Sequence, residues 1–215
     1  MIISICNEKG GSGKSTLAQN IAIYEAIANN RKILLLDTDP QKSLATFVNI
    51  RNEENKPKVF DFTYKFGEEL KQFLSKNKDK DIIVDTGGRD SREMRIAVVL
   101  SDIVIIPTIP SQYDVSVLDK MVNVIKTAKE ANPKLVAYIV INRSSPNPFL
   151  RKKIESLKGF IKELECDYIK LCDTIIYERE KYKISTQMGL GVVEMNDKKT
   201  KEEIENLCKE IYNGI

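Results

Sequence analysis

Two lysines flank a glycine-rich stretch a few residues into the chain. Residues 6–16 read CNEKGGSGKST, and the lysines are Lys9 and Lys14. Glycines in such a stretch let backbone N–H groups converge on phosphate oxygens, because no Cβ stands in the way. The segment ends like the phosphate-binding pattern GxxxxGK[ST], in which the lysine reaches the β- and γ-phosphates and the hydroxyl, here Ser15, ligates Mg²⁺. The residues therefore predict a nucleotide site.

The match to this pattern is incomplete, because Glu8 stands where the pattern opens with glycine. A glycine-rich loop that only turns the chain is the plain alternative. The flanking sequence argues against it, since a strand-like run at 2–5 precedes the loop and a helical stretch at 15–28 follows it. The N-terminus of that helix adds partial positive charge for phosphate. The predicted phosphate-binding residues are Gly10, Gly11, Ser12, Gly13, Lys14, Ser15 and Thr16.

Two later segments place carboxylates directly after strand-like apolar runs. LLLDTDPQKS carries Asp37 and Asp39, and DIIVDTGGRDS carries Asp85 followed by Gly87 and Gly88. Phosphoryl transfer needs positioning and charge neutralisation rather than a covalent nucleophile, which suits carboxylates and a bound Mg²⁺. Each segment alone is also compatible with a buried strand that ends in a turn. Together with the glycine loop, and in this order, they favour a nucleoside triphosphate site.

Composition excludes several other kinds of site. The 215 residues contain no histidine, which rules out Ser-His-Asp and Cys-His nucleophile systems. The four cysteines include no C-x-x-C pair, so free buried thiols in a reducing cytosol are expected rather than a zinc site. The formal net charge of +3 is too small to mark a dedicated nucleic-acid binder. No leader-like start or membrane-spanning apolar run occurs, so a cytoplasmic protein is expected.

Apolar runs alternate with segments of helical periodicity along the chain. The runs are continuous, which indicates strands buried on both faces, as in a parallel sheet. The sequence therefore predicts an α/β fold, a doubly wound and mostly parallel sheet flanked by helices, in a single domain over residues 1–215. The expected strands are 2–5, 33–36, 81–84, 102–107 and 135–141, with edge strands at 58–62 and 167–171.

Apolar stripes at helical spacing predict three helices in the second half of the chain. The predicted helices are 114–130, 149–165 and 200–214. The first has Asp114 as its expected N-cap and ends at Asn132 and Pro133. The polar stretches 49–58 and 75–81 are interpreted as surface connections, because strand-like sequence resumes after each.

The motif that begins with Lys9, together with three later segments, resembles the motifs of a known protein family. KGGSGKS is similar to the deviant Walker A box of the ParA/MinD family of ATPases, DTDPQ resembles the family's switch I, and DIIVDTGG resembles its Walker B strand with a following switch. VINRSSPNP at 140–148 resembles its base-recognition segment. The resemblance implies the fold of a P-loop NTPase of the deviant Walker A type. It also implies ATP and Mg²⁺ as cofactors and ATP hydrolysis as the reaction.

The same resemblance implies a role for each matching residue. Lys9 is the lysine that reaches the partner's phosphates across a nucleotide-sandwich dimer, and Lys14 is the ordinary phosphate lysine. Asp39 orients or activates the attacking water. The expected catalytic residues are thus Lys9, Lys14 and Asp39. The expected Mg²⁺ residues are Ser15, Asp37 and Asp85. The expected base site is Asn142, which reads the adenine edge, with Arg143 beside it.

Two motifs, DTGGRDS and IPSQYDV, look most like the short plasmid and chromosome partition ATPases that lack an N-terminal DNA-binding domain. This resemblance implies an ATP-dependent homodimer that binds nucleoid DNA without sequence preference and drives DNA partition. A centromere-binding adaptor protein of the ParB or ParG kind would then stimulate hydrolysis. DNA binding would depend on neutralisation of DNA phosphates by Lys and Arg side chains. Any single one of the candidate side chains could equally well be a charge on a solvated helix face. The candidate cations are Arg143, Arg151, Lys152, Lys153, Lys158 and Lys162.

The sequence is also compatible with other functions of such an ATPase. A MinD-like membrane cycle needs a basic amphipathic C-terminal helix, but residues 201–215 carry two lysines against four glutamates. That helix is therefore expected to pack on the core, with no membrane partner. Positioning of a carboxysome or receptor array uses the same chemistry, whereas Lys9 and DTDPQ argue against a biosynthetic P-loop enzyme. Glu8 replaces a neutral glutamine common in the family, and a pair with Lys9 that tunes dimer exchange is one hypothesis for it.

Overall fold

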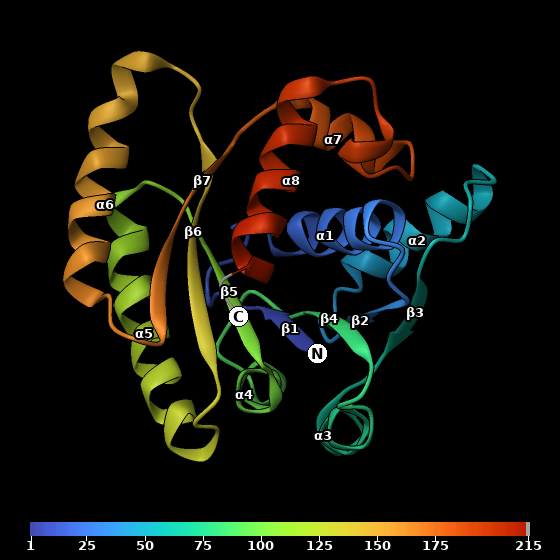
Figure 1. Cartoon of the computed structure of the whole chain (residues 1–215), viewed down its shortest axis with the longest axis horizontal. Coiled ribbons are helices and arrows are strands. Elements are labelled where there is room, and N and C mark those ends of the chain that lie inside the picture. Colours follow the sequence, from blue (N-terminus) through green and yellow to red (C-terminus); the bar gives the residue numbers. More distant parts are fainter. Residues whose placement is uncertain (214–215) are drawn as a thin grey trace.

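The computed structural model describes residues 1–213, apart from the side chain of Gln112 (Figure 1). Its strands form one sheet in the order β3-β2-β4-β1-β5-β6-β7, and each neighbouring pair is parallel. The strands are β1 (Ile2–Ile5), β2 (Ile33–Asp37), β3 (Asp61–Tyr64), β4 (Asp81–Asp85), β5 (Ile103–Thr108), β6 (Val136–Ser144) and β7 (Ile169–Tyr177). The helices are α1 (Lys14–Ala28), α2 (Ser43–Glu53), α3 (Gly67–Lys76), α4 (Arg92–Leu100), α5 (Gln112–Ala131), α6 (Arg151–Leu164), α7 (Glu180–Gln187) and α8 (Lys198–Asn213), with short 3₁₀ turns η1 (Pro148–Leu150) and η2 (Val192–Glu194). The predicted doubly wound α/β fold is confirmed.

Helices cover both faces of the sheet (Figure 1). α1, α2, α7 and α8 lie on one face, where Ile3 of β1 and Leu207 of α8 belong to the same buried core. α3, α4, α5 and α6 lie on the other face, over cores that contain Leu70 and Leu118. Ile2 faces this second side, so consecutive residues of β1 enter opposite cores. A strand in that position is buried at every residue, which explains the long apolar runs.

The carboxyl ends of three central strands meet at one edge of the sheet. β1 lies between β4 and β5, where the strand order reverses and doubly wound sheets open a ligand crevice. Asp85 pairs in register with Ile5 on one side and with Asp37 on the other. The start of the glycine loop and these two carboxylates therefore emerge at the same level.

The five predicted central strands are all present, with shifted ends. β2 and β4 each extend one residue further, to Asp37 and Asp85, and β7 runs on to Tyr177. The predicted edge strand 58–62 is wrong in position, because β3 pairs with β2 only from Asp61 onward. The partner strand fixes where β3 starts, and apolar periodicity carries no information about that register.

The helix predictions hold in outline and fail at particular residues. The three predicted helices correspond to α5, α6 with η1, and α8, although residue 214 lies outside the described residues. Asp114 is not the N-cap of α5, since the helix begins two residues earlier with Ser111 as N-cap. Residues 49–53 belong to α2 rather than to a connection, because Arg51 occupies a buried position on the stripe of that helix. α2, α3, α4 and α7 were not predicted from the sequence.

Burial corrects one prediction about the cysteines and supports one about the C-terminal helix. Cys6, Cys172 and Cys208 are buried, but Cys166 is exposed, because it lies in the surface turn that follows α6. The apolar stripe of α8 is buried against α1 and β7, as predicted. In the described part of the chain, no helix is long and apolar enough to cross a bilayer. That residues 1–215 form a single domain remains a prediction.

Candidate functional site

The phosphate loop joins β1 to α1 through two glycines in the left-handed region. The φ angle is 73° at Gly11 and 91° at Gly13, where other residues are strained. A Cβ on Gly13 would also clash with Nδ2 of Asn142. Gly13 is the N-cap residue of α1, so the N-terminus of a 15-residue helix points into the loop. This end of the helix has the backbone shape and partial charge that bind phosphate.

Lys14, the first residue of α1, is held inside the loop. Its side chain is buried, and Nζ donates a hydrogen bond to the carbonyl oxygen of Lys9 at 3.0 Å. Burial lowers the pKa of Lys14, while the negative charge of Asp85 opposes this shift. A lysine kept within the curl of the loop is placed to contact phosphate oxygens, as the loop motif requires.

A pocket of about 630 Å³ opens over the loop. One end is formed by the phosphate loop with Asp39 and Gly88, and the other end by the last residues of β7 and those that follow it. A volume in this range suits a nucleotide-sized ligand. The residues at the phosphate end are Gly10, Gly11, Gly13, Lys14, Ser15, Thr16, Asp39, Ser43 and Gly88. The residues at the far end are Ile176, Tyr177, Glu178, Arg179, Tyr182, Lys183, Thr186 and Gln187.

Asp85 is a fully buried carboxylate with neither oxygen hydrogen-bonded to a described residue. Burial raises the pKa of Asp85 to about 8, against the opposing effects of the Ser15 hydroxyl and the Lys14 charge nearby. An orphaned buried carboxylate next to a phosphate loop is what a cation site requires. The described side chains form no closed cluster of three or more metal-binding groups. Mg²⁺ fits this arrangement, because it binds nucleotides through few protein ligands and keeps several waters.

Asp37, the last residue of β2, and Asp39, which follows it, have different environments. Asp37 is buried, and its two oxygens accept hydrogen bonds from the backbone N–H groups of Asp39 at 2.8 Å and Leu44 at 3.2 Å. Burial raises the pKa of Asp37, while these backbone donors lower it. Asp37 thus fixes the turn, whereas Asp39 is half-buried and lines the pocket. The turn holds the Asp39 carboxylate over the phosphate end.

The glycine pair after β4 packs against both neighbouring segments. A Cβ on Gly88 would lie 2.7 Å from Cα of Gly10, and a Cβ on Gly87 would lie 3.6 Å from the carboxylate of Asp39. These distances leave room for hydrogen alone at Gly88 and place the pair between the phosphate loop and the segment after β2. The three segments predicted to form one site are therefore in contact.

Lys9 lies outside the pocket of its own chain. Its Nζ donates to Oδ2 of Asp114 at 2.6 Å, and its side chain is 32% exposed whereas that of Asp114 is fully buried. The hypothesis that Glu8 pairs with Lys9 is not supported, because the ion-pair partner of Lys9 among the described residues is Asp114. Glu8 instead lies near Arg95, whose pKa is raised first by Asp90 and slightly by Glu8.

Asn142 and Arg143 contact the phosphate loop from the end of β6. Nδ2 of Asn142 donates to the carbonyl oxygen of Ser12 at 2.6 Å. Arg143 has a left-handed backbone with φ of 50°, and its guanidinium donates to the carbonyl oxygen of Gly11 and to Glu178. Both residues line the pocket. Arg143 therefore bridges the two ends of the site, and the adenine-reading role of Asn142 stays a prediction.

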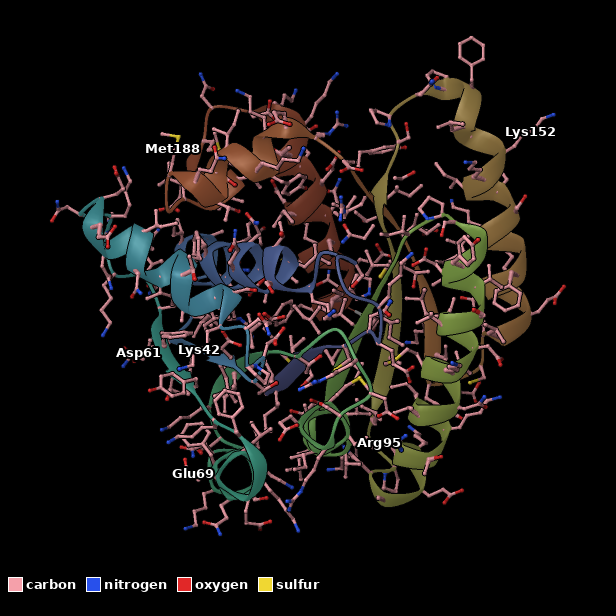
Figure 2. All side chains as sticks on the ribbon, turned by 180° about the vertical axis from the view of Figure 1, so that it is seen from behind. Lys42, Asp61, Glu69, Arg95, Lys152 and Met188 are labelled. Carbon is pink, nitrogen blue, oxygen red and sulfur yellow. The ribbon has the colours of Figure 1, made fainter. Side chains whose placement is uncertain are left out.

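The structure separates Arg143 from the other cations predicted to bind DNA. Arg143 lies over the pocket, while the remaining five are on α6, and Figure 2 shows Lys152 on the outer side of that helix. α6 carries five lysines or arginines against two glutamates. Within the described residues, none of these five cations has an acidic partner in an ion pair. Lys158 is half-buried and the other four are exposed: Arg151, Lys152, Lys153 and Lys162.

The far end of the pocket was missed at the sequence level. Its residues lie at the end of β7 and after it, whereas the apolar pattern predicts this strand only over 167–171 and the strand continues to Tyr177. Asp173 and Thr174 interrupt the apolar pattern in the middle of β7, so the predicted strand stopped before Ile175 and Ile176. The signal available was that the polar run YEREKYK follows a parallel strand, because site residues gather at the carboxyl ends of such strands.

The chain is similar to known proteins. A family described as the CobQ/CobB/MinD/ParA nucleotide binding domain matches residues 3–190. The chain belongs to this family. The CobQ/CobB/MinD/ParA match includes the phosphate loop, all three carboxylates, the residues at the end of β6 and the far wall of the pocket. The recognised resemblance to ParA and MinD is confirmed.

Individual relatives span nearly the whole chain. The chain is 23% identical to maintenance of carboxysome distribution protein A of Halothiobacillus neapolitanus, over 97% of this chain and 95% of that protein. It is 26% identical to protein ParA of Rhizobium radiobacter, over 92% of this chain and 87% of that protein. The crystal structure of a putative plasmid partition protein from Borrelia burgdorferi bound to AMPPNP superimposes with a TM-score of 0.73 at 22% identity, over 100% and 99% of the two chains. The last comparison supports the fold.

Proposed function

We propose that this chain is an ATPase that dimerises on ATP, binds nucleoid DNA without sequence preference and drives DNA partition when an adaptor protein stimulates hydrolysis. The observation that carries the proposal is the position of Lys9, which lies outside its own pocket while Lys14 and Asp39 line it. A phosphate-loop lysine that points away from its own pocket gains a phosphate partner when a second chain presents one. The family resemblance implies that arrangement.

The contacts within one chain support a role for each of the other site residues. Backbone N–H groups of the loop and Lys14 bind the phosphates, and the half-buried Asp39 orients the attacking water. Ser15 and Asp85 would hold Mg²⁺, with Asp37 behind them. When bound, Mg²⁺ neutralises charge on the β- and γ-phosphate oxygens. Asp37 otherwise keeps the turn that carries Asp39 in place.

The proposed DNA surface is the exposed face of α6. Five cations there have no acidic partner in the described structure, so their charge is available to DNA phosphates. One α6 face of this size supports only weak DNA binding. In an ATP-bound dimer two such faces are linked, so after one face binds DNA the other binds in an intramolecular step, which raises the overall affinity. ATP would in this way control DNA affinity without any new contact in the monomer. Binding of this kind weakens steeply as salt rises.

A second candidate is the positioning of a protein assembly rather than DNA. The observation that favours it is the carboxysome distribution protein of Halothiobacillus neapolitanus, which matches almost from end to end. In both cases the chain would go through the same cycle of ATP hydrolysis and would bind nucleoid DNA. The two candidates differ only in the adaptor that stimulates hydrolysis and in the cargo that the adaptor holds.

The test is an electrophoretic shift on random duplex DNA with ATP, with ADP and without nucleotide, across a salt series. We expect binding with ATP that ADP does not support and that falls steeply with salt. Binding that is independent of nucleotide would contradict the proposed switch. Flotation with anionic liposomes is the parallel arm, and ATP-dependent recovery with the liposomes instead of DNA would favour a membrane cycle.

A further inference from the structure

The C-terminal helix α8 holds the far wall of the pocket through one carboxylate. Glu203 of α8 accepts hydrogen bonds from Nε of Arg179 at 2.7 Å, from the hydroxyl of Tyr182 at 2.9 Å and from the backbone N–H of Tyr177 at 3.4 Å. All three donors belong to residues that line the pocket. Glu203 itself does not line the pocket, and its side chain is 10% exposed.

The donors surround Glu203 as a buried ionic group requires. A carboxylate taken out of water is costly unless several donors satisfy it, and here one cation, one hydroxyl and one backbone N–H do so. Burial raises the pKa of Tyr182, and the neighbouring Glu203 charge raises it further. Tyr182 therefore keeps its proton and remains a donor to Glu203. The contacts fix the Tyr182 side chain of α7, the Arg179 side chain before it and the backbone of Tyr177 at the end of β7 against a single point on α8.

The wall that these contacts hold faces the part of the pocket away from the phosphate loop. Lys14 and the loop N–H groups occupy one end, so a nucleotide bound there would direct its nucleoside toward the residues after β7. Arg179 and Tyr182 are in that far wall. A shift of either side chain would change contacts with the nucleoside and leave the phosphate end intact.

We propose that Glu203 is a positioning residue that sets the nucleoside wall of the pocket, so that α8 controls affinity for the nucleoside part of a nucleotide but not for its triphosphate. This inference rests on the proposed nucleotide site. It assigns to the C-terminal helix a function beyond core packing. It also explains why a glutamate stands in a mostly apolar contact surface.

A neighbouring glutamate supplies a matched control. Glu210 lies on the same helix, two turns after Glu203, and its carboxylate accepts hydrogen bonds from the backbone N–H groups of Asp173 and Thr174. Neither of these residues lines the pocket. Glu210→Gln therefore makes the same chemical change on the same helix without touching the wall.

The experiment compares the full-length wild type with Glu203→Gln and Glu210→Gln. Calorimetry measures the affinity of each for ATP and for inorganic tripolyphosphate, both with Mg²⁺. We expect Glu203→Gln to weaken ATP binding about tenfold, the loss typical of hydrogen bonds to a charged group, with tripolyphosphate affinity unchanged. We expect Glu210→Gln to match the wild type for both ligands.

A gentler variant keeps the test decisive if Glu203→Gln folds poorly. Tyr182→Phe keeps the ring and removes one donor, and about a fivefold loss of ATP affinity is expected with tripolyphosphate unchanged. Equal ATP affinity in wild type and both wall variants would overturn the inference, and so would a parallel loss of ATP and tripolyphosphate binding. If the wild type itself bound no ATP, the proposed function would fall first, which distinguishes the two failures.

Discussion

Nζ of Lys9 lies 2.6 Å from Oδ2 of Asp114, a carboxylate contributed by the first turn of α5. The same carboxylate accepts a hydrogen bond from Ser111. Lys14 in the same loop turns inward instead and contacts the Lys9 carbonyl. The two lysines of one short loop therefore face different partners, and their loss should have different effects.

Replacing Lys9 with alanine should separate dimer formation from nucleotide binding. Lys9 does not line its own pocket, so ATP affinity of the monomer should change by less than about tenfold, which corresponds to ~1.4 kcal/mol. ATP-dependent dimerisation should weaken by at least about 30-fold, in line with loss of a charge pair at an interface. Light scattering with and without ATP measures the dimer. Asp114→Asn is the control, because it frees Lys9 without removing it and should leave the dimer intact.

Replacing Asp39 with alanine should stop hydrolysis without abolishing binding. Asp39 lines the phosphate end of the pocket, while the turn around it is fixed by Asp37. Loss of a residue that orients or deprotonates water typically costs at least about a hundredfold in rate. The variant should retain ATP affinity and accumulate as a dimer. Phosphate release in single turnover measures the rate, and turnover at the wild-type rate would remove Asp39 from the mechanism.

Replacing Gly13 with alanine should damage the loop itself. The residue has φ of 91°, and a Cβ there meets the amide of Asn142. Left-handed backbone alone costs about 1–2 kcal/mol for a non-glycine residue, so a loss of at least about 2 kcal/mol of unfolding free energy is expected together with weaker ATP binding. Urea denaturation measures the stability. Gly159→Ala on α6 is the control, since a Cβ there meets nothing within 4 Å and stability should stay equal or rise.

Asp85 should make the metal-free protein less stable as pH rises. Its folded pKa of about 8 lies above the ordinary value of 3.8, so the folded state holds a proton that the unfolded state releases between these values. The free energy of unfolding should therefore fall with pH across this window, by up to about 1.4 kcal/mol per pH unit. Denaturation in EDTA from pH 5 to 8 measures the slope. Asp85→Asn should remove this contribution, and an unchanged slope would mean that Asp85 titrates normally.

Reversing charge on α6 should weaken DNA binding and its dependence on salt. Lys152 and Lys153 are exposed and unpaired within the described residues. The double change to glutamate should lower the slope of log affinity against log salt by about 0.9 for each lost phosphate contact. ATP binding should not change. The same double change at Lys71 and Lys76 on α3 is the matched control, and an equal loss of DNA binding there would show a general charge effect rather than a surface on α6.

The sequence alone determined the elements whose pattern is local. Continuous apolar runs predicted β1, β2, β4, β5 and β6, because a strand buried on both faces has to be apolar at consecutive positions. The phosphate loop was predictable for the same kind of reason, since its glycine spacing is encoded within 11 residues and the helix follows directly in the sequence. Asp37, Asp39 and Asp85 were predicted as site residues from their places at strand ends. Parallel strands place such ends at the same edge of the sheet.

Tertiary structure alone decided the partners that lie far apart in the chain. The contact of Lys9 with Asp114 joins residues 105 apart, and the contact of Tyr182 with Glu203 joins α7 to α8. Charged side chains are the commonest surface residues, so their type and spacing do not reveal which of them are buried with a partner. The strand order and the packing of α5 and α8 bring these groups together. The sequence therefore predicted which segments form the phosphate end of the pocket, and the fold decided where Lys9 points and which helix holds the far wall.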